Sequence, residues 1–215
     1  MKYNKIGIIV AMTKEYELVK STLQNTVENE VHKFKFCTGS LGDKQIILMK
    51  SGIGKVNAAV ASIEMIEIYT PDCIINTGVA GGIDRSLNVA DIVIGEQTTY
   101  HDYYAGDVAD HIKELGFPVN ILADASMLNS LRTLGAKNNG IKFGLICTGD
   151  QFITNNVVLE QIKAKHPFGL AVDMESNSIA HVCFLRDVPF LSFRIISDTP
   201  WVDNQNEQYL NFWES

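Results

Sequence analysis

The sequence predicts an α/β fold, a single-domain three-layer α/β/α architecture around a mixed, largely parallel central sheet. Apolar runs typical of strands alternate with helical patterns along the chain. The strand runs are continuously apolar, as in strands that are covered on both faces. With 215 residues, 46% of them hydrophobic, the chain is long enough for one sizeable core. Because no repeat, linker or low-complexity segment interrupts it, we expect residues 1–215 to form one domain.

Strands are expected wherever an apolar run is bounded by turn residues. In chain order these runs cover residues 5–11, 33–40, 44–50, 73–77, 91–97, 142–147 and 189–198. The second and third are separated by Leu41-Gly42-Asp43, which predicts a hairpin. The run at 73–77 ends in a glycine-rich loop, Gly78–Gly82, where backbone can approach a ligand closely.

Helices are predicted between these strands. Thr13 is expected to cap the first, with Glu15 and Glu17 in its first turn, where the helix dipole favours anions. The other helical patterns cover residues 58–69, 125–134 and 156–165, and a last one opens at Glu175. Residues 100–120 are polar and without periodicity, which indicates a loop.

Composition narrows the class of protein. The formal net charge of −7 argues against a nucleic-acid surface, which needs a basic footprint. No stretch reaches the roughly 18 apolar residues of a membrane span. The four cysteines lie far apart in apolar contexts, which favours reduced, buried thiols in a cytoplasmic protein. A small-molecule or protein partner is therefore expected.

Polar or glycine-rich residues follow the predicted strands at their carboxyl ends, where ligands gather in sheets of this kind. The six segments are Met12–Glu15, Ser51–Gly54, Gly78–Gly82, Thr148–Ile153, Asp173–Glu175 and Ser197–Asp198. Arg194 lies within an apolar strand and needs a buried acidic partner. One arginine and several carboxylates from separate strand ends predict a small-molecule site with acid–base groups.

Two weaker motifs have simpler interpretations. Gly52-Ile-Gly-Lys-Val56 resembles part of a phosphate-binding loop, but it lacks the spacer and the hydroxyl after lysine, so a tight turn before a helix is favoured. His101 and Asp102, with Asp107, Asp110 and His111, match no helical metal-ligand spacing. A solvated loop is favoured there, and no metal is expected.

The motifs together resemble the bacterial 5′-methylthioadenosine/S-adenosylhomocysteine nucleosidases of the nucleoside phosphorylase/hydrolase superfamily. They occur in family order along almost the whole chain. They are Gly7–Met12 with Glu15, Lys50–Val56, Asn76–Gly82, Val89–Val93, Tyr100–Asp102, Thr148–Ile153, Ala171–Glu175 and Arg194–Asp198. The resemblance implies a nucleoside phosphorylase-like fold and hydrolysis of the N-glycosidic bond of 5′-substituted adenine nucleosides, without metal or cofactor.

The resemblance also implies roles for individual residues. Asp198, held by Ser197, would protonate adenine at N7, Glu15 would activate water, and Arg194 would organise water and carboxylates. Glu175 would bind the ribose hydroxyls. The residues implied to pack around the nucleoside are Met174 at the sugar, Phe152 and Ile153 at the base, and Gly81, Met12, Ile53 and Val79 elsewhere in the pocket.

The chain departs from the family pattern at several places. Asp173 stands where the family usually has glutamate, and Val79 replaces a common serine. Residues 103–118 diverge from the family pattern. In the family this segment shapes the 5′-substituent pocket across the dimer, so the identity of the 5′ substituent stays open. The C-terminal helix is expected to be short, with Tyr209 or Phe212 as the aromatic that covers the site.

Two other functions stay open at this point. A purine nucleoside phosphorylase would need an arginine-rich phosphate site, which the strand ends lack. A non-catalytic nucleoside binder would not need the intact Glu15, Glu175, Arg194 and Asp198 set. The family implies a cytoplasmic homodimer acting in methionine salvage, and Val108, Ile112 and Phe117 are the apolar residues that favour the dimer.

Overall fold

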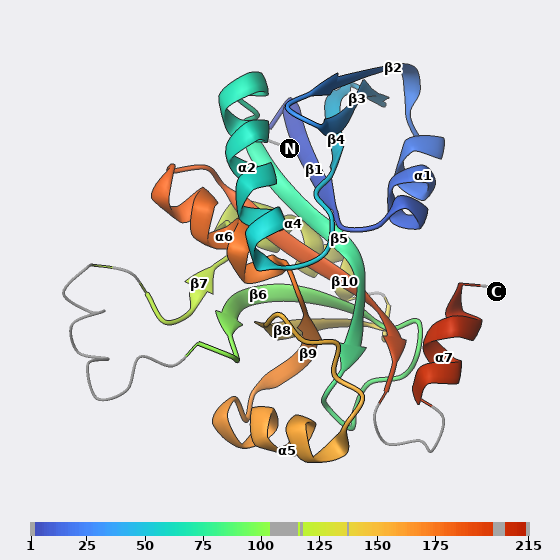
Figure 1. Cartoon of the computed structure of the whole chain (residues 1–215), viewed down its shortest axis with the longest axis vertical. Coiled ribbons are helices and arrows are strands. Elements are labelled where there is room, and N and C mark those ends of the chain that lie inside the picture. The colour runs from blue at the N-terminus through green and yellow to red at the C-terminus, as the bar shows by residue number, and fades with distance from the viewer. Residues whose placement is uncertain (1–2, 104–115, 117, 137, 200–204, 214–215) are drawn as a thin grey trace.

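A computed structural model describes residues 3–103, 116, 118–136, 138–199 and 205–213. One mixed sheet runs through it, and helices lie around it (Figure 1). The strands are β1 (Lys5–Val10), β2 (Gln24–Val31), β3 (Phe34–Leu41), β4 (Lys44–Lys50), β5 (Cys73–Gly82), β6 (Ile92–Tyr100), β7 (Ile121–Leu122), β8 (Ile141–Thr148), β9 (Gly169–Asp173) and β10 (Phe190–Asp198). The helices are α1 (Thr13–Ser21), α2 (Lys55–Tyr69), α4 (Ala125–Gly135), α5 (Asn156–Lys165), α6 (Ser176–Leu185) and α7 (Gln205–Phe212).

The strand pairings bring the predicted site segments together. Parallel pairs join β1 to β4 and β5, β5 to β10, and β8 to β6 and β9. Antiparallel pairs between β10 and β6 and between β5 and β9 close five of these strands into a ring. Because parallel strands end at the same edge, the carboxyl ends of β1, β4, β5 and β10 lie close together.

Side chains alternate between two helical layers, which explains the continuous apolar runs. On β1, β4 and β5, Ile9, Ile47 and Ile74 pack with α2 and α6. Their neighbours Ile6 and Cys73 belong to a second cluster that includes Met127 of α4. Strands buried on both faces must be apolar at every position, whichever way a side chain points.

The described part of the chain has no helix both long and apolar enough to span a membrane.

The structure corrects several predicted elements. Residues 24–31 form the edge strand β2, which was not predicted because this segment has no apolar pattern. β5 continues through Gly78–Gly82 instead of ending in a loop, because Gly81 and Gly82 pair with β9. Helix α2 begins at Lys55, three residues earlier than predicted. Thr13 does not cap α1, since Met12 occupies the cap position and Thr13 is already helical.

Candidate active site

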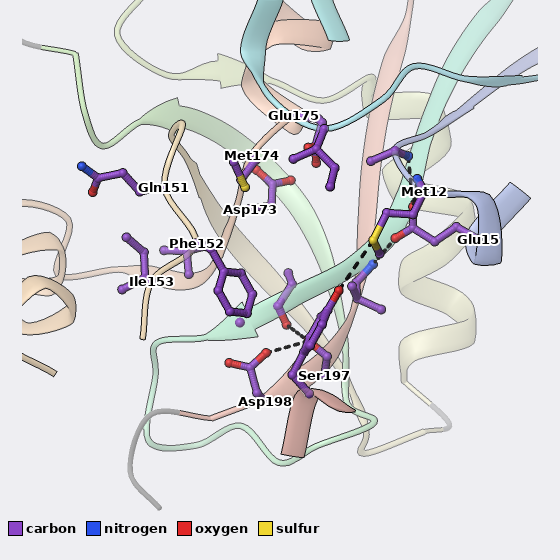
Figure 2. A pocket seen from close by; sticks show the side chains of 17 residues that line it. Met12, Glu15, Gln151, Phe152, Ile153, Asp173, Met174, Glu175, Ser197 and Asp198 are labelled. Atoms are coloured by element: carbon purple, nitrogen blue, oxygen red, sulfur yellow. Dashed lines mark hydrogen bonds between the residues drawn. The ribbon is translucent and has the colours of Figure 1, made fainter. Parts of the chain in front are cut away.

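A pocket of about 600 Å³, its open mouth included, lies at the carboxyl ends of the strands (Figure 2). All six predicted strand-end segments contribute to its wall. Of the twelve predicted site residues, those that line the pocket are Met12, Glu15, Ile53, Val79, Gly81, Phe152, Ile153, Met174, Glu175, Ser197 and Asp198. The twelfth, Arg194, lies behind the wall.

Glu15 is held in the wall by backbone amides from the turn after β1 and from β5. One carboxylate oxygen accepts hydrogen bonds from the amides of Ala11 and Met12 at 3.0 and 2.9 Å, and the other accepts from Val79 at 3.0 Å. Gly78 makes this possible, because a side chain there would collide with Glu15 and its φ of 149° suits glycine. The carboxylate is therefore buried, and its orientation is fixed by three hydrogen bonds from backbone amides.

Arg194, on β10, is buried and paired with carboxylates, as its place in an apolar strand requires. Its nearest carboxylate is Asp173, at 2.7 Å, whereas Glu175 lies 3.6 Å away. Thr148 donates a hydrogen bond of 2.6 Å to the other oxygen of Asp173. Asn76 and Ser176 also accept hydrogen bonds from the guanidinium. Arg194 therefore acts on the pocket through Asp173 and Glu175.

Glu175 stands at the start of α6, with its side chain turned into the pocket wall. Gly54 donates a backbone hydrogen bond of 2.9 Å to its carboxylate. Burial raises the pKa of Glu175 to about 7, and the negative charge of Asp173 adds to this, although Arg194 opposes the shift. A carboxyl group with a pKa near 7 can hold or release a proton at neutral pH.

Ser197 and Asp198 end β10 and face the pocket together (Figure 2). The Ser197 hydroxyl lies 2.7 Å from the Asp198 carboxylate and 3.3 Å from the carbonyl oxygen of Ala80. Both residues are buried. Figure 2 shows Asp198 well separated from Glu15, so two carboxylates reach the same cavity from different sides.

Aromatic and sulfur-containing side chains also line the pocket. The side chain of Phe152 is 55% exposed, although it lines the pocket. Tyr209 of α7 also lines it, with its ring 5.2 Å from that of Phe152 and its hydroxyl 3.6 Å from the sulfur of Met12. Of the two candidate aromatics, Tyr209 is the one that lines the pocket.

Other predictions for this region were incomplete or wrong. Asp173 and Gln151 line the pocket but were not predicted as site residues; the unpaired charge of Arg194 was the signal that could have indicated Asp173. The solvated loop predicted at His101 and Asp102 is wrong for His101, which is buried, whereas Asp102 is exposed and binds Lys55. The remaining members of that cluster, Asp107, Asp110 and His111, and the apolar Val108, Ile112 and Phe117 lie outside the described residues.

Comparison with known proteins gives one consistent family. A model described as the phosphorylase superfamily matches residues 5–214. A 5′-methylthioadenosine/S-adenosylhomocysteine nucleosidase of Haemophilus influenzae is 40% identical over 199 residues, which are 90% of this chain and 85% of the relative.

Two solved structures extend the comparison. The nucleosidase of the same kind from S. pneumoniae, solved with the transition-state inhibitor MT-ImmA, superposes with a TM-score of 0.88 at 31% identity and covers 97% of this chain and 91% of its own. The futalosine hydrolase of Helicobacter pylori superposes with a TM-score of 0.83 at 29% identity, and the superposition covers 99% of this chain and 91% of the hydrolase.

Proposed function

Because the chain belongs to the phosphorylase superfamily and, within it, to the 5′-methylthioadenosine/S-adenosylhomocysteine nucleosidases, we propose that it hydrolyses the N-glycosidic bond of these adenine nucleosides. Water adds to C1′ of the ribose while the bond to the base breaks, and the products are adenine and the free thioribose. The observation that carries this proposal is the pair of carboxylates, Glu15 and Asp198, that line one pocket.

Asp198 is the acid on the base side. As the glycosidic bond breaks, electrons move onto adenine, and a proton delivered to N7 neutralises the charge that develops there. The Ser197 hydroxyl, 2.7 Å from the carboxyl group, orients it. Phe152, exposed within the pocket, provides a ring face on which the base stacks. The backbone of Ile153, the next residue, hydrogen-bonds the edge of the base.

Glu15 is the base that takes a proton from the attacking water. Its three amide donors fix the carboxylate, so that little reorganisation is needed when the water is activated. The two groups work on opposite partners of one bond, as in inverting glycoside hydrolysis. Glu175 receives the ribose hydroxyls and Met174 packs against the sugar.

The same three amides favour water over phosphate as the nucleophile. The amides of Ala11, Met12 and Val79 are donors that could hold an anion, but the carboxylate of Glu15 already occupies them. A phosphate beside Glu15 would meet a like charge, and the nearby cation Arg194 is paired with Asp173. This arrangement disfavours the phosphorylase alternative.

The 5′ substituent lies toward Met12, Ile53, Val79 and Tyr209, the part of the wall formed by apolar and sulfur-containing groups. Such a surface suits a methylthio group better than a charged one. The resemblance to a futalosine hydrolase gives a second substrate class to test beside the thioadenosines.

The testing experiment incubates purified protein with methylthioadenosine, with and without phosphate, and follows both products. We expect adenine and free methylthioribose at a rate that phosphate does not change. Phosphate-dependent methylthioribose-1-phosphate would identify a phosphorylase. An absence of turnover with methylthioadenosine, adenosylhomocysteine, 5′-deoxyadenosine and futalosine, despite tight binding, would identify a nucleoside binder.

The homodimer is also part of the proposal. Val56 and Val60 lie one turn apart on α2 and expose apolar side chains, which suits a surface that a second copy covers. Size-exclusion chromatography with light scattering tests it, and a monomer at micromolar concentration would contradict it.

We further propose that residues 1–215 act as one domain, in the cytoplasm and in methionine salvage. The four free, buried cysteines suit a reducing compartment. Release of adenine and thioribose from methylthioadenosine is the kind of reaction that returns sulfur to methionine. Accumulation of methylthioadenosine in cells that lack the protein, and its reversal when the gene is restored, would test the salvage role.

A further inference from the structure

The glycine turn before α2 carries Ile53 of the pocket wall, but Lys55, which follows it, has no role in the reaction as described so far. Gly54 caps the helix with φ at 98°, a conformation that suits glycine, and no side chain of the turn caps the first amides. Two carboxylates from distant segments fill these positions instead. Gly54 donates to Glu175 at 2.9 Å and Lys55 donates to Asp150 at 2.7 Å. The positive end of the helix dipole favours both carboxylates.

The ammonium group of Lys55 is bound in the same place. It contacts both oxygens of Asp102, at 2.7 and 2.8 Å, and lies over the ring of Tyr100. One of these oxygens also accepts a hydrogen bond of 2.9 Å from the amide of Asp150. Burial alone would raise the pKa of Asp102, but the hydrogen bonds from Lys55 lower it, so the carboxylate stays ionised.

The motif that resembled a phosphate-binding loop therefore binds the chain's own carboxylates. Its amides and its lysine hold Glu175, Asp150 and Asp102, which lie far from the turn in the sequence. Three segments meet here: the start of α2, the residues after β6 and the loop after β8. Two of these segments lead directly into a wall of the pocket, because Ile53 precedes Gly54 and residues 151–153 follow Asp150. The segment after β6 supplies Asp102, which joins the other two.

We propose that Lys55, Asp102 and Asp150 form a clamp that positions the nucleoside-binding walls against each other. The clamp residues do not line the pocket. They act through Glu175, which the proposed function places at the ribose, and through Phe152, which it places at the base. They are positioning residues, and the proposal rests on the proposed function for the identity of the ligand.

The chain offers a matched control for the clamp. Lys163 and Asp84 form a second lysine–aspartate pair, with a distance of 2.6 Å and side chains 27% and 28% exposed. In the Lys55–Asp102 pair the ammonium nitrogen lies 2.7 Å from a carboxylate oxygen, a similar distance, and the side chains are 27% and 19% exposed. Neither Lys163 nor Asp84 lines the pocket. Removing either pair should therefore affect folding stability similarly, and only the clamp should affect binding.

The test uses full-length protein with Lys55→Gln, Asp102→Asn, the double variant and Lys55→Arg, beside Lys163→Gln and Asp84→Asn. Calorimetry measures the affinity for adenine and for the inhibitor MT-ImmA, and steady-state kinetics measures kcat and KM. We expect each single clamp variant to bind MT-ImmA about tenfold more weakly, and the double variant no worse than the singles, because both lose the same contact.

The expected kinetic effect is a tenfold rise in KM with kcat changed by less than about threefold, since the acid and base are untouched. Arginine at position 55 should restore most of the affinity, because it can bind a carboxylate with two donors. The Lys163 and Asp84 variants should match wild type in affinity and KM.

The clamp proposal would be overturned if the clamp variants bound MT-ImmA as tightly as wild type, or if the double variant lost the sum of the two single losses. Equal losses of affinity in the Lys163 and Asp84 variants would also overturn it. The binding arm does not depend on turnover. A wild-type protein that binds MT-ImmA but releases no adenine would contradict the proposed function, and the affinities of the variants would still decide the clamp. A wild-type protein that binds neither ligand would overturn both proposals.

Discussion

Glu175 gives the protein a pH-dependent stability that one substitution should remove. Its carboxyl group is buried beside Asp173 and Arg194, and burial raises its pKa from 4.5 to about 7. Glutamine has nearly the same shape and can still accept the hydrogen bond from Gly54, but it cannot ionise. Comparing Glu175 with glutamine therefore isolates the free energy of ionising this buried group.

The magnitude follows from the two pKa values. A change from 4.5 to about 7 on folding corresponds to roughly 3 kcal/mol, at about 1.4 kcal/mol per pKa unit. Below pH 4.5 both the folded and the unfolded chain hold the proton, and this contribution to the free energy of unfolding is complete. As pH rises through 7 it is lost, because the unfolded chain releases its proton first.

Urea unfolding of wild type and Glu175→Gln at about pH 5 and about pH 8 measures the effect. The free energy of unfolding of wild type should fall relative to the variant by most of the expected 3 kcal/mol between those pH values. Glu160→Gln, a change at an exposed position on α5, is the control and should follow wild type. Parallel pH profiles of wild type and Glu175→Gln would refute the reasoning and show that Arg194 offsets the effect of burial on the pKa of Glu175.

Two further substitutions test the carboxylates around the pocket. Asp198→Asn should lower kcat by about 10²- to 10⁴-fold while MT-ImmA still binds, because only the proton donor is lost; adenine release at the wild-type rate would exclude Asp198 as the acid. Asp173→Asn should lower the free energy of unfolding by about 3 kcal/mol, since it removes the nearest partner of a buried arginine. Glu67→Gln, which removes an exposed partner of Arg186, should cost less than about 1 kcal/mol in the same urea titrations, and equal losses would contradict the importance of burial.

The strand pattern and the family resemblance predicted where the site would lie and which chemical groups would form it. Continuously apolar runs require cover on both faces, so they predicted an α/β sheet, and polar residues at their ends predicted a common edge. All six predicted strand-end segments line the pocket for this reason, and they contain eleven of the twelve site residues that the resemblance implied. The assignment of roles came from the family resemblance, because no periodicity distinguishes an acid such as Asp198 from a helix cap.

Which charges pair and how far the strands extend depend on contacts between segments that are distant in the sequence. Arg194 needed a carboxylate, but its choice of Asp173 over Glu175 depends on the geometry of β9 against β10. β2 is almost wholly exposed and has no apolar pattern, so its pairing with β3 is what makes it a strand. Lys55 and Asp102 are 47 positions apart, and their contact exists only because β6 and α2 meet at one edge. Pairings of this kind are long-range contacts, which a local sequence pattern does not encode.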